Sequence, residues 1–500
     1  MQTQASPQNI TFNVNSTVDA TDANPGNGVC ETSPGNGVCT LRAAVQEANS
    51  LAGTDTISLS NGTYILDIAG SSENASATGD LDILDPLILI GENADTTTVD
   101  ANGIDRVFDV QADLEIIGIT IKGGNGDWPG GGGIMNMANT FLTESMIMSN
   151  TISGINQSGG AIYNGSRLTI VDSQIISNTK TESGGISAGI YNSGYLTVTN
   201  SIFQKNSSND PFGSGEAIFN NYTGKVILSN VDFHNNIWEI DTKCGGSAIE
   251  SKGILEISNN TFTGNGTAVS IGEYWEYNPL YTPFPSQTII SNTLIAHNYG
   301  DCSTAFEGMI HMDGNLAEVT IVNTTIYSNT GFNSAGFLSN RGTAHLLNVT
   351  VTDNKFSWQY DRANGIHVEP STQYITSSLF ITNSIVTNNG FQNCIGEITS
   401  GGHNIDSGTT CNFNSLGDKI NTNPLLGPLA NNGGQTLTLN PLFGSPAIDA
   451  GDNTICPTID QRGVTRPLDG DNNMVAICDI GAVEHEYSPP ELLYLPAILK

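Results

Sequence analysis

Basic side chains are scarce in this sequence. Its 500 residues include 16 Lys and Arg against 49 Asp and Glu, which gives a formal net charge of −33. A surface with that charge repels phosphate backbones and anionic membrane surfaces, so we expect no nucleic-acid partner. We interpret the charge as a means of keeping a surface-rich protein soluble.

Long apolar runs are missing as well. No stretch approaches the roughly 20 apolar residues that span a bilayer, so we predict no transmembrane segment. The first residues, MQTQASPQN, contain neither a basic nor an apolar region. Either a signal peptide has been removed or the chain never had one.

A short pattern repeats nine times between Glu144 and Asn389. A polar residue, seven times Asn, is followed by alternating apolar and polar residues and then by a second Asn six positions later. The spacings between the closing asparagines are 28, 28, 30, 29, 33, 31, 25 and 35 residues. Such a period is typical of a solenoid in which each repeat is one rung. The closing residues are Asn150, Asn178, Asn206, Asn236, Asn265, Asn298, Asn329, Asn354 and Asn389.

Apolar side chains within a rung follow the spacing of strands. In RLTIVDSQIISN, Leu168, Ile170 and Ile175 alternate with polar residues, and no helical period is present. An additional motif precedes the early rungs and ends at Asn136, Asn164, Asn192 and Asn220, which indicates three strands per rung. Because one rung cannot bury its few aliphatic residues, equivalent positions must stack about 4.8 Å apart. We therefore predict an all-β fold, a right-handed parallel β-helix.

The closing asparagines have a structural interpretation in this fold. Asn tolerates left-handed backbone at corners, and stacked amides can form a hydrogen-bonded ladder. We expect the nine residues to do both.

Local cysteine pairs favour an oxidising compartment, and hence removal of a signal peptide. Cys244 and Cys302 lie two rungs apart, about 10 Å, beyond the roughly 7 Å that a disulfide allows between Cα atoms. They need a bent loop or stay reduced. We predict three disulfides: Cys30–Cys39, Cys394–Cys411 and Cys456–Cys478.

One segment, LRAAVQEANSL at residues 41–51, has the pattern of an amphipathic helix. Its apolar side chains share one face, and Thr40 is suited to be its N-cap. We expect this helix to cover the first rung, because an open strand edge would pair with other chains.

Both ends of the chain resemble known bacterial domains. The stretch CTLRAAVQEANSLAGTDTISLSNGTYIL (39–66) resembles the CSLREA N-terminal domain, with Ala43 where that family has Glu. The region from Gly401 to Glu484 resembles the choice-of-anchor Q domain, which closes many secreted β-helix proteins. These resemblances imply export and surface location and imply no common reaction. The predicted regions are a CSLREA-like region (1–56), rungs (57–400), a choice-of-anchor Q-like cap (401–486) and a tail (487–500).

That tail contains eight largely apolar residues, Leu492 to Leu499, too few to span a membrane. A sorting tag, a docking peptide and a disordered end are the alternatives.

Catalytic groups are weakly indicated. Parallel β-helices include polysaccharide lyases and hydrolases, which need a base beside cation-binding acids or two facing carboxylates. We find no sustained acid pair at equivalent positions of neighbouring rungs and assign no catalytic residue. For His403 we expect a capping role. The charged candidates, each interpreted as a solvated loop residue, are Glu273, Glu276, His311, Asp313, Asp361, Arg362, His367 and Glu369.

A metal site is also weakly indicated. Asp469, Asp471 and Asn473 have the opening spacing of a calcium loop, but Met474 and Ile480 replace its Gly and Glu. We interpret the segment as a tight polar turn. We assign no metal ligand or cofactor, with Ca²⁺ as the open alternative.

All four Trp residues, including Trp128, fall between the repeated strands. Their flat amphipathic faces suit sugars and protein partners, although they could instead pack against the rod. Our main hypothesis is a secreted or cell-surface protein for adhesion or matrix structure that binds glycans or surface proteins. The alternatives are a polysaccharide lyase or glycoside hydrolase and a self-associating filament or surface-layer subunit. The predicted binding residues are Tyr274, Trp275, Tyr277, Tyr281, Trp358, Tyr360 and Trp238.

Overall fold

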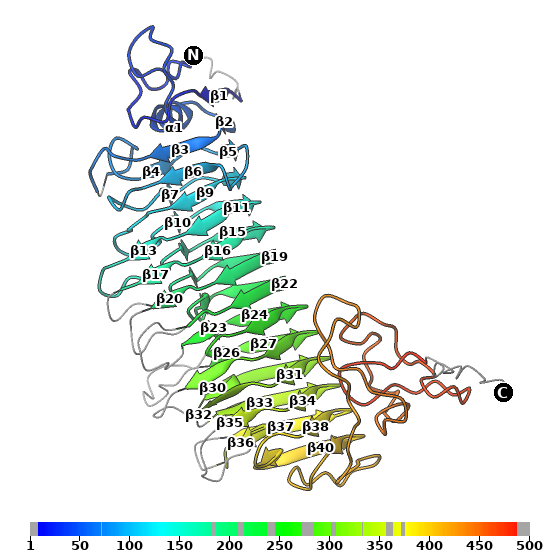
Figure 1. Cartoon of the computed structure of the whole chain (residues 1–500). Coiled ribbons are helices and arrows are strands. Elements are labelled where there is room, and N and C mark those ends of the chain that lie inside the picture. Colours follow the sequence, from blue (N-terminus) through cyan, green and yellow to red (C-terminus); the bar gives the residue numbers. More distant parts are fainter. Residues whose placement is uncertain are drawn as a thin grey trace, which may run out of the picture.

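A rod of parallel strands and the segments that join them makes up most of the chain (Figure 1). The computed structural model describes residues 9–71, 73–181, 186–208, 215–237, 246–272, 285–301, 307–332, 334–356, 364–371 and 376–487. In these ranges every pairing between named strands is parallel and joins equivalent strands of successive rungs, as in β14 with β18 and β18 with β21. The predicted right-handed parallel β-helix is confirmed.

Three faces surround the interior, and the first face carries the strand that opens each rung. Its strands are β4 (Leu81–Ile83), β7 (Phe108–Val110), β10 (Ile134–Asn136), β14 (Ile162–Asn164), β18 (Ile190–Asn192), β21 (Ile218–Asn220), β23 (Ser247–Ser251), β26 (Thr267–Gly272), the first part of β30 (Glu307–Val322), the first part of β33 (Ser334–Leu347), β36 (Ile366–Val368) and β39 (Cys394–Ile395).

The second face follows in each rung and begins with the first strand of the chain. Its strands are β1 (Thr11–Val14), β2 (Asp55–Leu59), β5 (Leu87–Gly91), β8 (Leu114–Ile117), β11 (Asn139–Thr143), β15 (Arg167–Val171), the first parts of β19 (Tyr195–Gln204) and β22 (Lys225–His234), β24 (Ile254–Ser258), β27 (Gln287–Ser291), the later parts of β30 and β33, β37 (Ser377–Thr382) and β40 (Ile398–Gly402).

The third face closes each rung. It contains β3 (Gly62–Ile65), β6 (Thr97–Asp100), β9 (Thr120–Lys122), β12 (Met146–Met148), β16 (Gln174–Ile176), the later parts of β19 and β22, β25 (Thr261–Thr263), β28 (Leu294–Ala296), β31 (Thr325–Tyr327), β34 (Thr350–Thr352), β38 (Ile385–Thr387) and β41 (Ile405–Asp406). Two small sheets follow it, with strands β13 (Thr151–Ile152), β17 (Thr179–Lys180), β20 (Ser207–Ser208), β29 (Tyr299–Asp301), β32 (Thr330–Phe332) and β35 (Lys355–Phe356).

Stacked apolar side chains fill the interior. Ile162 and Ile190 pair in register, and both are fully buried. The rings of Phe203, Phe233 and Phe262 stack with centroid distances of 5.1 and 4.6 Å. Each such side chain contributes about 1.5–3 kcal/mol by leaving water. A column only one or two side chains wide therefore provides enough burial for each added rung.

Buried asparagine side chains run along one interior corner. Asn150 Nδ2 donates to Asn178 Oδ1 at 3.1 Å, and the same bond recurs in every rung to Asn389. The amide of Asn178 also donates to the Ile147 carbonyl at 3.0 Å, and its oxygen accepts from the backbone N–H of Asn150. Each amide thus joins three successive rungs.

A second amide ladder, which we did not predict, borders the first face. Asn136 Nδ2 donates to Asn164 Oδ1 at 2.8 Å, Asn164 to Asn192 at 2.7 Å, and Asn192 to Asn220 at 2.9 Å. The ladder continues to the hydroxyl of Ser251. Its members are the residues that close the additional motif of the early rungs.

Left-handed backbone occurs at neighbouring positions instead of at the ladder asparagines. The polar residue that opens each pattern is left-handed, with φ from 47° at Asn323 to 59° at Asn259. The residue just before each ladder Asn is also left-handed, for example Asn235 with φ 53°. Our expectation that one set of residues both turns the corner and stacks its amides was wrong. A ladder residue needs an ordinary backbone conformation for its amide to point inward, so the neighbouring residue adopts the left-handed conformation that makes the turn.

A capping helix, α1 (Leu41–Asn49), covers the first rung, and Thr40 accepts from Ala43 N as its N-cap. It is buried on nearly all sides because the surrounding N-terminal segments bind its polar residues. Arg42 Nε lies 2.7 Å from Asp19 Oδ1, and Glu47 Oε2 accepts from Gly26 N at 2.6 Å. The amphipathic pattern predicted only its inner face.

Three disulfides close local loops, at Cys30–Cys39, Cys394–Cys411 and Cys456–Cys478. Cys244 and Cys302 lie outside the described residues. In the part of the chain that the structure covers, no helix has the length and apolar character needed to cross a bilayer.

Residues after the last rung first cover its edge and then run back beside the rod (Figure 1). Lys419 bridges to Ile405 on the last rung. Farther on, Gln461 Oε1 accepts from Thr325 Oγ1 at 2.6 Å, and Ala482 N donates to Thr350 Oγ1 at 3.1 Å. This C-terminal segment therefore covers the third face of several rungs as well as the end.

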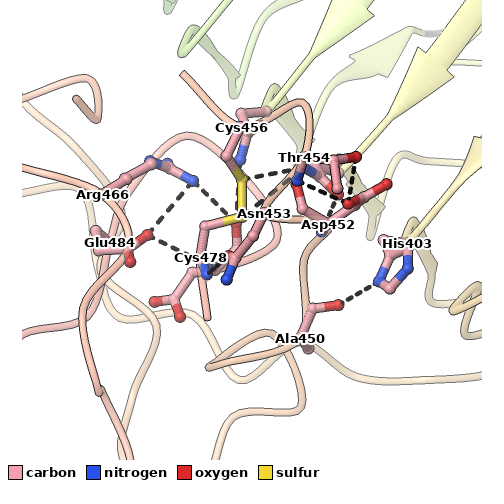
Figure 2. The surroundings of a disulfide bond; sticks show 12 residues. His403, Ala450, Asp452, Asn453, Thr454, Cys456, Arg466, Cys478 and Glu484 are labelled. Carbon is pink, nitrogen blue, oxygen red and sulfur yellow. Dashed lines mark hydrogen bonds and ion pairs between the residues drawn. A yellow bond between two sulfur atoms is a disulfide. The ribbon is translucent and has the colours of Figure 1, made fainter. Parts of the chain in front are cut away.

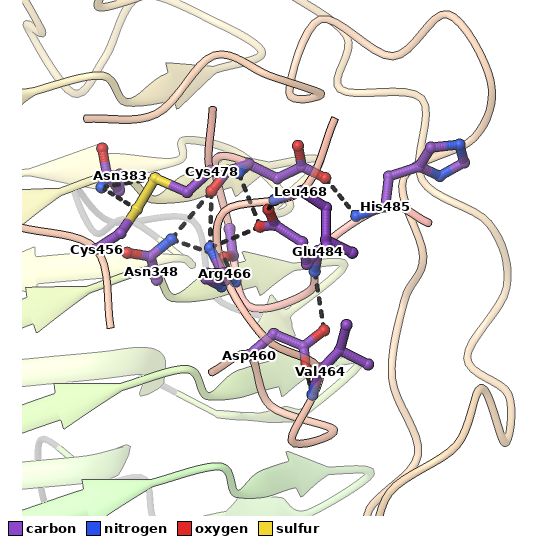
Figure 3. A network of polar contacts seen from close by, with 12 residues as sticks. Asn348, Asn383, Cys456, Asp460, Val464, Arg466, Leu468, Cys478, Glu484 and His485 are labelled. Carbon is purple, nitrogen blue, oxygen red and sulfur yellow. Dashed lines mark hydrogen bonds and ion pairs between the residues drawn. A yellow bond between two sulfur atoms is a disulfide. The ribbon is translucent and has the colours of Figure 1, made fainter. Parts of the chain in front are cut away.

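Buried charges hold the C-terminal segment together (Figure 3). Arg466 donates to the carbonyls of Asp479 and Gly481, both at 2.9 Å, and lies 3.5 Å from Glu484 Oε2. Asn348 of the rod donates to the same Asp479 carbonyl at 3.0 Å. Burial and the nearby Glu484 charge raise the pKa of Asp479 to about 8.

We predict that Asn236→Ala lowers the free energy of unfolding by about 2–3 kcal/mol, because the two buried donors of Asn206 lose their acceptor and Asn265 Oδ1 loses a donor. The matched control is Asn235→Gly, at the adjacent exposed left-handed position, which Gly adopts without strain. Urea denaturation followed by circular dichroism measures both. Equal stability of the two variants would contradict the ladder's role.

Candidate functional site

One column of side chains on the first face points away from the interior. Strand residues alternate between the two sides of a sheet, so the middle residue of each short first-face strand lies outside. The register of the strands aligns these residues along the rod. We call this the outer column; its described members include Asp82, Asp109, Met135, Tyr163, Tyr191, Phe219, Glu250, Ser270, His311 and His367.

Acidic residues gather at the N-terminal end of the outer column. Asp82 pairs directly with Asp109 on the next rung, and Asp80 lies beside them, with carboxylate oxygens of the three within 4.8 Å of one another. Arg106 is the one cation facing them among the described residues, with Nε 3.6 Å from Asp80 and Nη1 3.4 Å from Asp109. Its Nη2 also pairs with Asp127. We predicted no sustained acid pair at equivalent positions of neighbouring rungs, and Asp82 with Asp109 is one single pair.

Burial makes this acidic group hard to ionise. The pKa of Asp80 is raised to about 8 and that of Asp82 to about 6, in both cases chiefly because burial disfavours the charged form. The pKa of Asp109 is raised for the same reason. Residues before β4 help to cover the group, since Ser76 N donates to Asp82 Oδ2 at 2.6 Å.

Aromatic rings occupy the middle of the outer column. The Tyr163 and Tyr191 rings stack at 5.0 Å, and Tyr191 and Phe219 stack at 5.6 Å, with planes within 14° in both cases. Lys252 places its Nζ 5.2 Å from the centre of the Phe219 ring. The described rings thus present their edges outward and share their faces with one another.

Imidazole and charged groups occupy the C-terminal part of the outer column. His311 and His367 are outer-column residues two rungs apart, about 10 Å. His367 Nε2 lies 3.3 Å from Glu369 Oε1, and Arg341 Nε lies 3.2 Å from Asp313 Oδ1. Burial lowers the pKa of His311 to about 4, so its ring is neutral at ordinary pH. His311, Asp313 and His367 were predicted as scattered loop charges, but the structure aligns them on strands of one face. Glu369, predicted with them, directly follows β36.

The predicted aromatic binding residues lie outside the described residues, as do Glu273, Glu276, Asp361 and Arg362. Trp128 is the one Trp that the described ranges include, and it is 75% exposed.

The predicted capping residue His403 lies between β40 and β41 in the last rung and faces Ala450 of the C-terminal segment (Figure 2). The His403 ring nitrogen Nδ1 is 2.7 Å from the Ala450 carbonyl, and its φ of 55° places it at a left-handed corner. Asp469 accepts from Asn473 N at 2.9 Å, which closes a tight turn. Asp449, missed by the sequence motif, joins Asp469 and Asp471 in a second group of three carboxylates. Calcium binding there stays a prediction.

Comparisons with known proteins give fold-level likenesses only. No family model and no curated protein matches the chain, so the resemblances to the CSLREA and choice-of-anchor Q domains stay predictions. A mutant tailspike protein of E. coli bacteriophage HK620 in complex with pentasaccharide is similar at 13% identity, with 78% of this chain and 77% of that chain covered and a TM-score of 0.38.

Two further solved structures are similar at a comparable level. The A-module of the Azotobacter vinelandii mannuronan C-5 epimerase AlgE6 has 14% identity, coverage of 73% and 95%, and a TM-score of 0.30. A mannuronic acid specific polysaccharide family 6 lyase from human gut microbiota has 11% identity, coverage of 72% and 81%, and a TM-score of 0.29. Likenesses this weak carry no information on activity or ligand.

The acidic group predicts that the N-terminal rungs are more stable in mild acid. Asp80 has a folded pKa of about 8 against an ordinary value of 3.8. Its contribution is therefore fully present below pH 4 and lost as the pH rises towards 8. We expect Asp80→Asn to reduce the fall in melting temperature between pH 5 and pH 8.5.

The matched control for this test is Asp95→Asn, at an exposed acid on a nearby loop. Differential scanning calorimetry at the two pH values gives the comparison. An identical fall in the wild-type chain and in Asp80→Asn would show that Asp80 does not control it.

Proposed function

We propose that this protein is a secreted or cell-surface rod that binds neutral glycans along its first face. The observation that carries the proposal is the position of the tryptophans in the topology. Each lies in a segment that joins directly to a first-face strand: Trp128 precedes β10, Trp238 precedes β23, Trp275 follows β26 and Trp358 precedes β36. None lies in a second- or third-face strand.

The chemistry of Trp supports this choice of ligand. Its ring offers a broad apolar surface with one N–H donor, which suits the C–H faces and hydroxyls of sugars. Trp128 is 75% exposed although a buried position would stabilise the fold more. Because rungs repeat along the axis, a repeating polymer can contact several of them at once. Such multiple contacts strengthen weak single ones.

The net charge narrows the class of glycan, and the disulfides narrow the location of the protein. With a net charge of −33, the protein repels polyanionic chains, which favours neutral glycans over acidic ones. Three disulfides are typical of proteins that work in oxidising surroundings. Both features support a role in adhesion outside the cell.

A second candidate function, cleavage of a polysaccharide, is supported by the imidazoles of the outer column. His367 is 5% exposed, and its Nδ1 has no hydrogen-bond partner among the described residues. The His367 ring, held by Glu369 through Nε2, could accept a proton from a bound sugar. New unsaturated or reducing ends from a polysaccharide panel, lost in His367→Ala, would favour this function over simple binding.

We predict that the double variant Trp275→Ala/Trp358→Ala weakens glycan binding at least roughly 30-fold, the loss typical of two aromatic anchors. The single variant Trp128→Ala should weaken it less. Surface plasmon resonance with neutral oligosaccharides selected on a glycan array measures the affinity. Melting temperatures should stay near the wild-type value, because the three positions fall between the named strands of the rungs.

The matched control is Tyr195→Ala, which removes a 50% exposed ring from β19 on the second face. It should leave the affinity unchanged. The proposal fails if the double variant binds as the wild type does, or if Tyr195→Ala weakens binding equally.

A further inference from the structure

An open groove lies between the C-terminal segment and the third face. One wall carries the outward side chains of Tyr327, Thr352 and Thr387 from β31, β34 and β38. The other wall consists of residues 423–428 with Leu439 and Leu442, and the groove has a volume of about 390 Å³.

The groove continues along the rod. Asp353 and Asn388 line both this hollow and a second one, also of about 390 Å³, whose rim includes Phe391. The two hollows together form a path for an extended chain.

Apolar side chains on both sides of this groove are left in water. Leu442 N donates to the Leu425 carbonyl at 2.8 Å, so these two residues are neighbours, and they are 49% and 40% exposed. Phe443 is 67% exposed and Phe391 is 84% exposed. A group of exposed apolar residues beside a groove is typical of a surface that a further segment covers.

A suitable segment begins next to this wall. The His485 ring nitrogen Nδ1 is 3.0 Å from the Pro441 carbonyl, which places the chain beside Leu442 just before residues 488–500. That tail reads SPPELLYLPAILK and carries one acid and one base. It is therefore apolar and nearly neutral, and a chain of charge −33 repels it little.

The length and stiffness of the tail also fit the groove. An extended chain spans about 3.3 Å per residue, so the five residues from Tyr487 to Leu492 reach about 16 Å. The Pro-Pro pair at 489–490 favours an extended conformation over this stretch. The groove from Tyr327 to Thr387 covers two rung steps, about 10 Å, which three or four extended residues fill.

We propose that the tail docks in the groove of its own molecule, with Leu492 to Leu495 against the wall formed by Leu425 and Leu442. This interaction covers both apolar surfaces and ties the C-terminal segment to the rod. It is independent of glycan binding on the first face. A second copy of the chain is the competing partner for the tail, and the experiment below separates the two.

Hydrogen–deuterium exchange of the full-length chain tests the proposal, with molar mass from light scattering at the same concentrations. Tail amides of the wild type should exchange on the order of ten-fold slower than an unfolded peptide. The tail variant Leu493→Asp/Leu495→Asp should lose that protection and speed exchange in 423–443. The groove variant Leu442→Asp should expose the tail amides equally.

Two control variants keep the proposal falsifiable. Glu491→Gln changes a tail charge, and Leu416→Asp changes an 85% exposed apolar residue that lines neither hollow; both should retain wild-type protection and a monomer mass. Tail amides that exchange at the unfolded rate in the wild type would overturn the proposal. Protection that depends on concentration, with a dimer mass that the tail variant reduces to a monomer, would also overturn it in favour of a second copy.

Discussion

Buried amides that hydrogen-bond from rung to rung are the constraint on which the rest of this rod depends. Stacked Ile and Phe side chains supply most of the burial, but apolar contact alone would tolerate a shift of register. A ladder amide tolerates none, because each donor and acceptor has one partner in the next rung, as in Asn206 Nδ2 with Asn236 Oδ1 at 3.0 Å. Rungs whose lengths differ by up to ten residues therefore stay aligned, and the extra residues leave the rod as inserts.

The ladders set the register and the inserts hold the extra residues, and this division of roles explains where function can vary. The connection from the second to the third face stays short, whereas the longer inserts adjoin the first face, where acids, aromatic rings and imidazoles follow one another along the outer column. The rigid strands fix the spacing of these groups, and the inserts can change without loss of the fold. The third face has a different role, since the C-terminal segment uses its Thr side chains and corner asparagines as hydrogen-bonding partners.

The repeated part of the fold could be predicted because the same residue types recur at one spacing. The helix and the local disulfides could be predicted because each depends on a short stretch of sequence. The Asp82 and Asp109 pair was missed since the first rungs lack the Asn pattern that reveals the register. No sequence pattern predicts that the C-terminal segment runs back along the rod, where Gln461 contacts Thr325, 136 residues earlier in the chain. The aromatic inserts were recognised from composition, and their role stays a prediction.

A double-mutant cycle between ladder residues tests the central claim most directly. Asn206→Ala and Asn236→Ala, on adjacent rungs, should show a coupling energy of about 1 kcal/mol or more in equilibrium denaturation. The same cycle between Asn206 and Asn354, which share no partner, should give about zero. Zero coupling between the adjacent pair would contradict the account, because the amides would then be filling space without setting the register of the rungs.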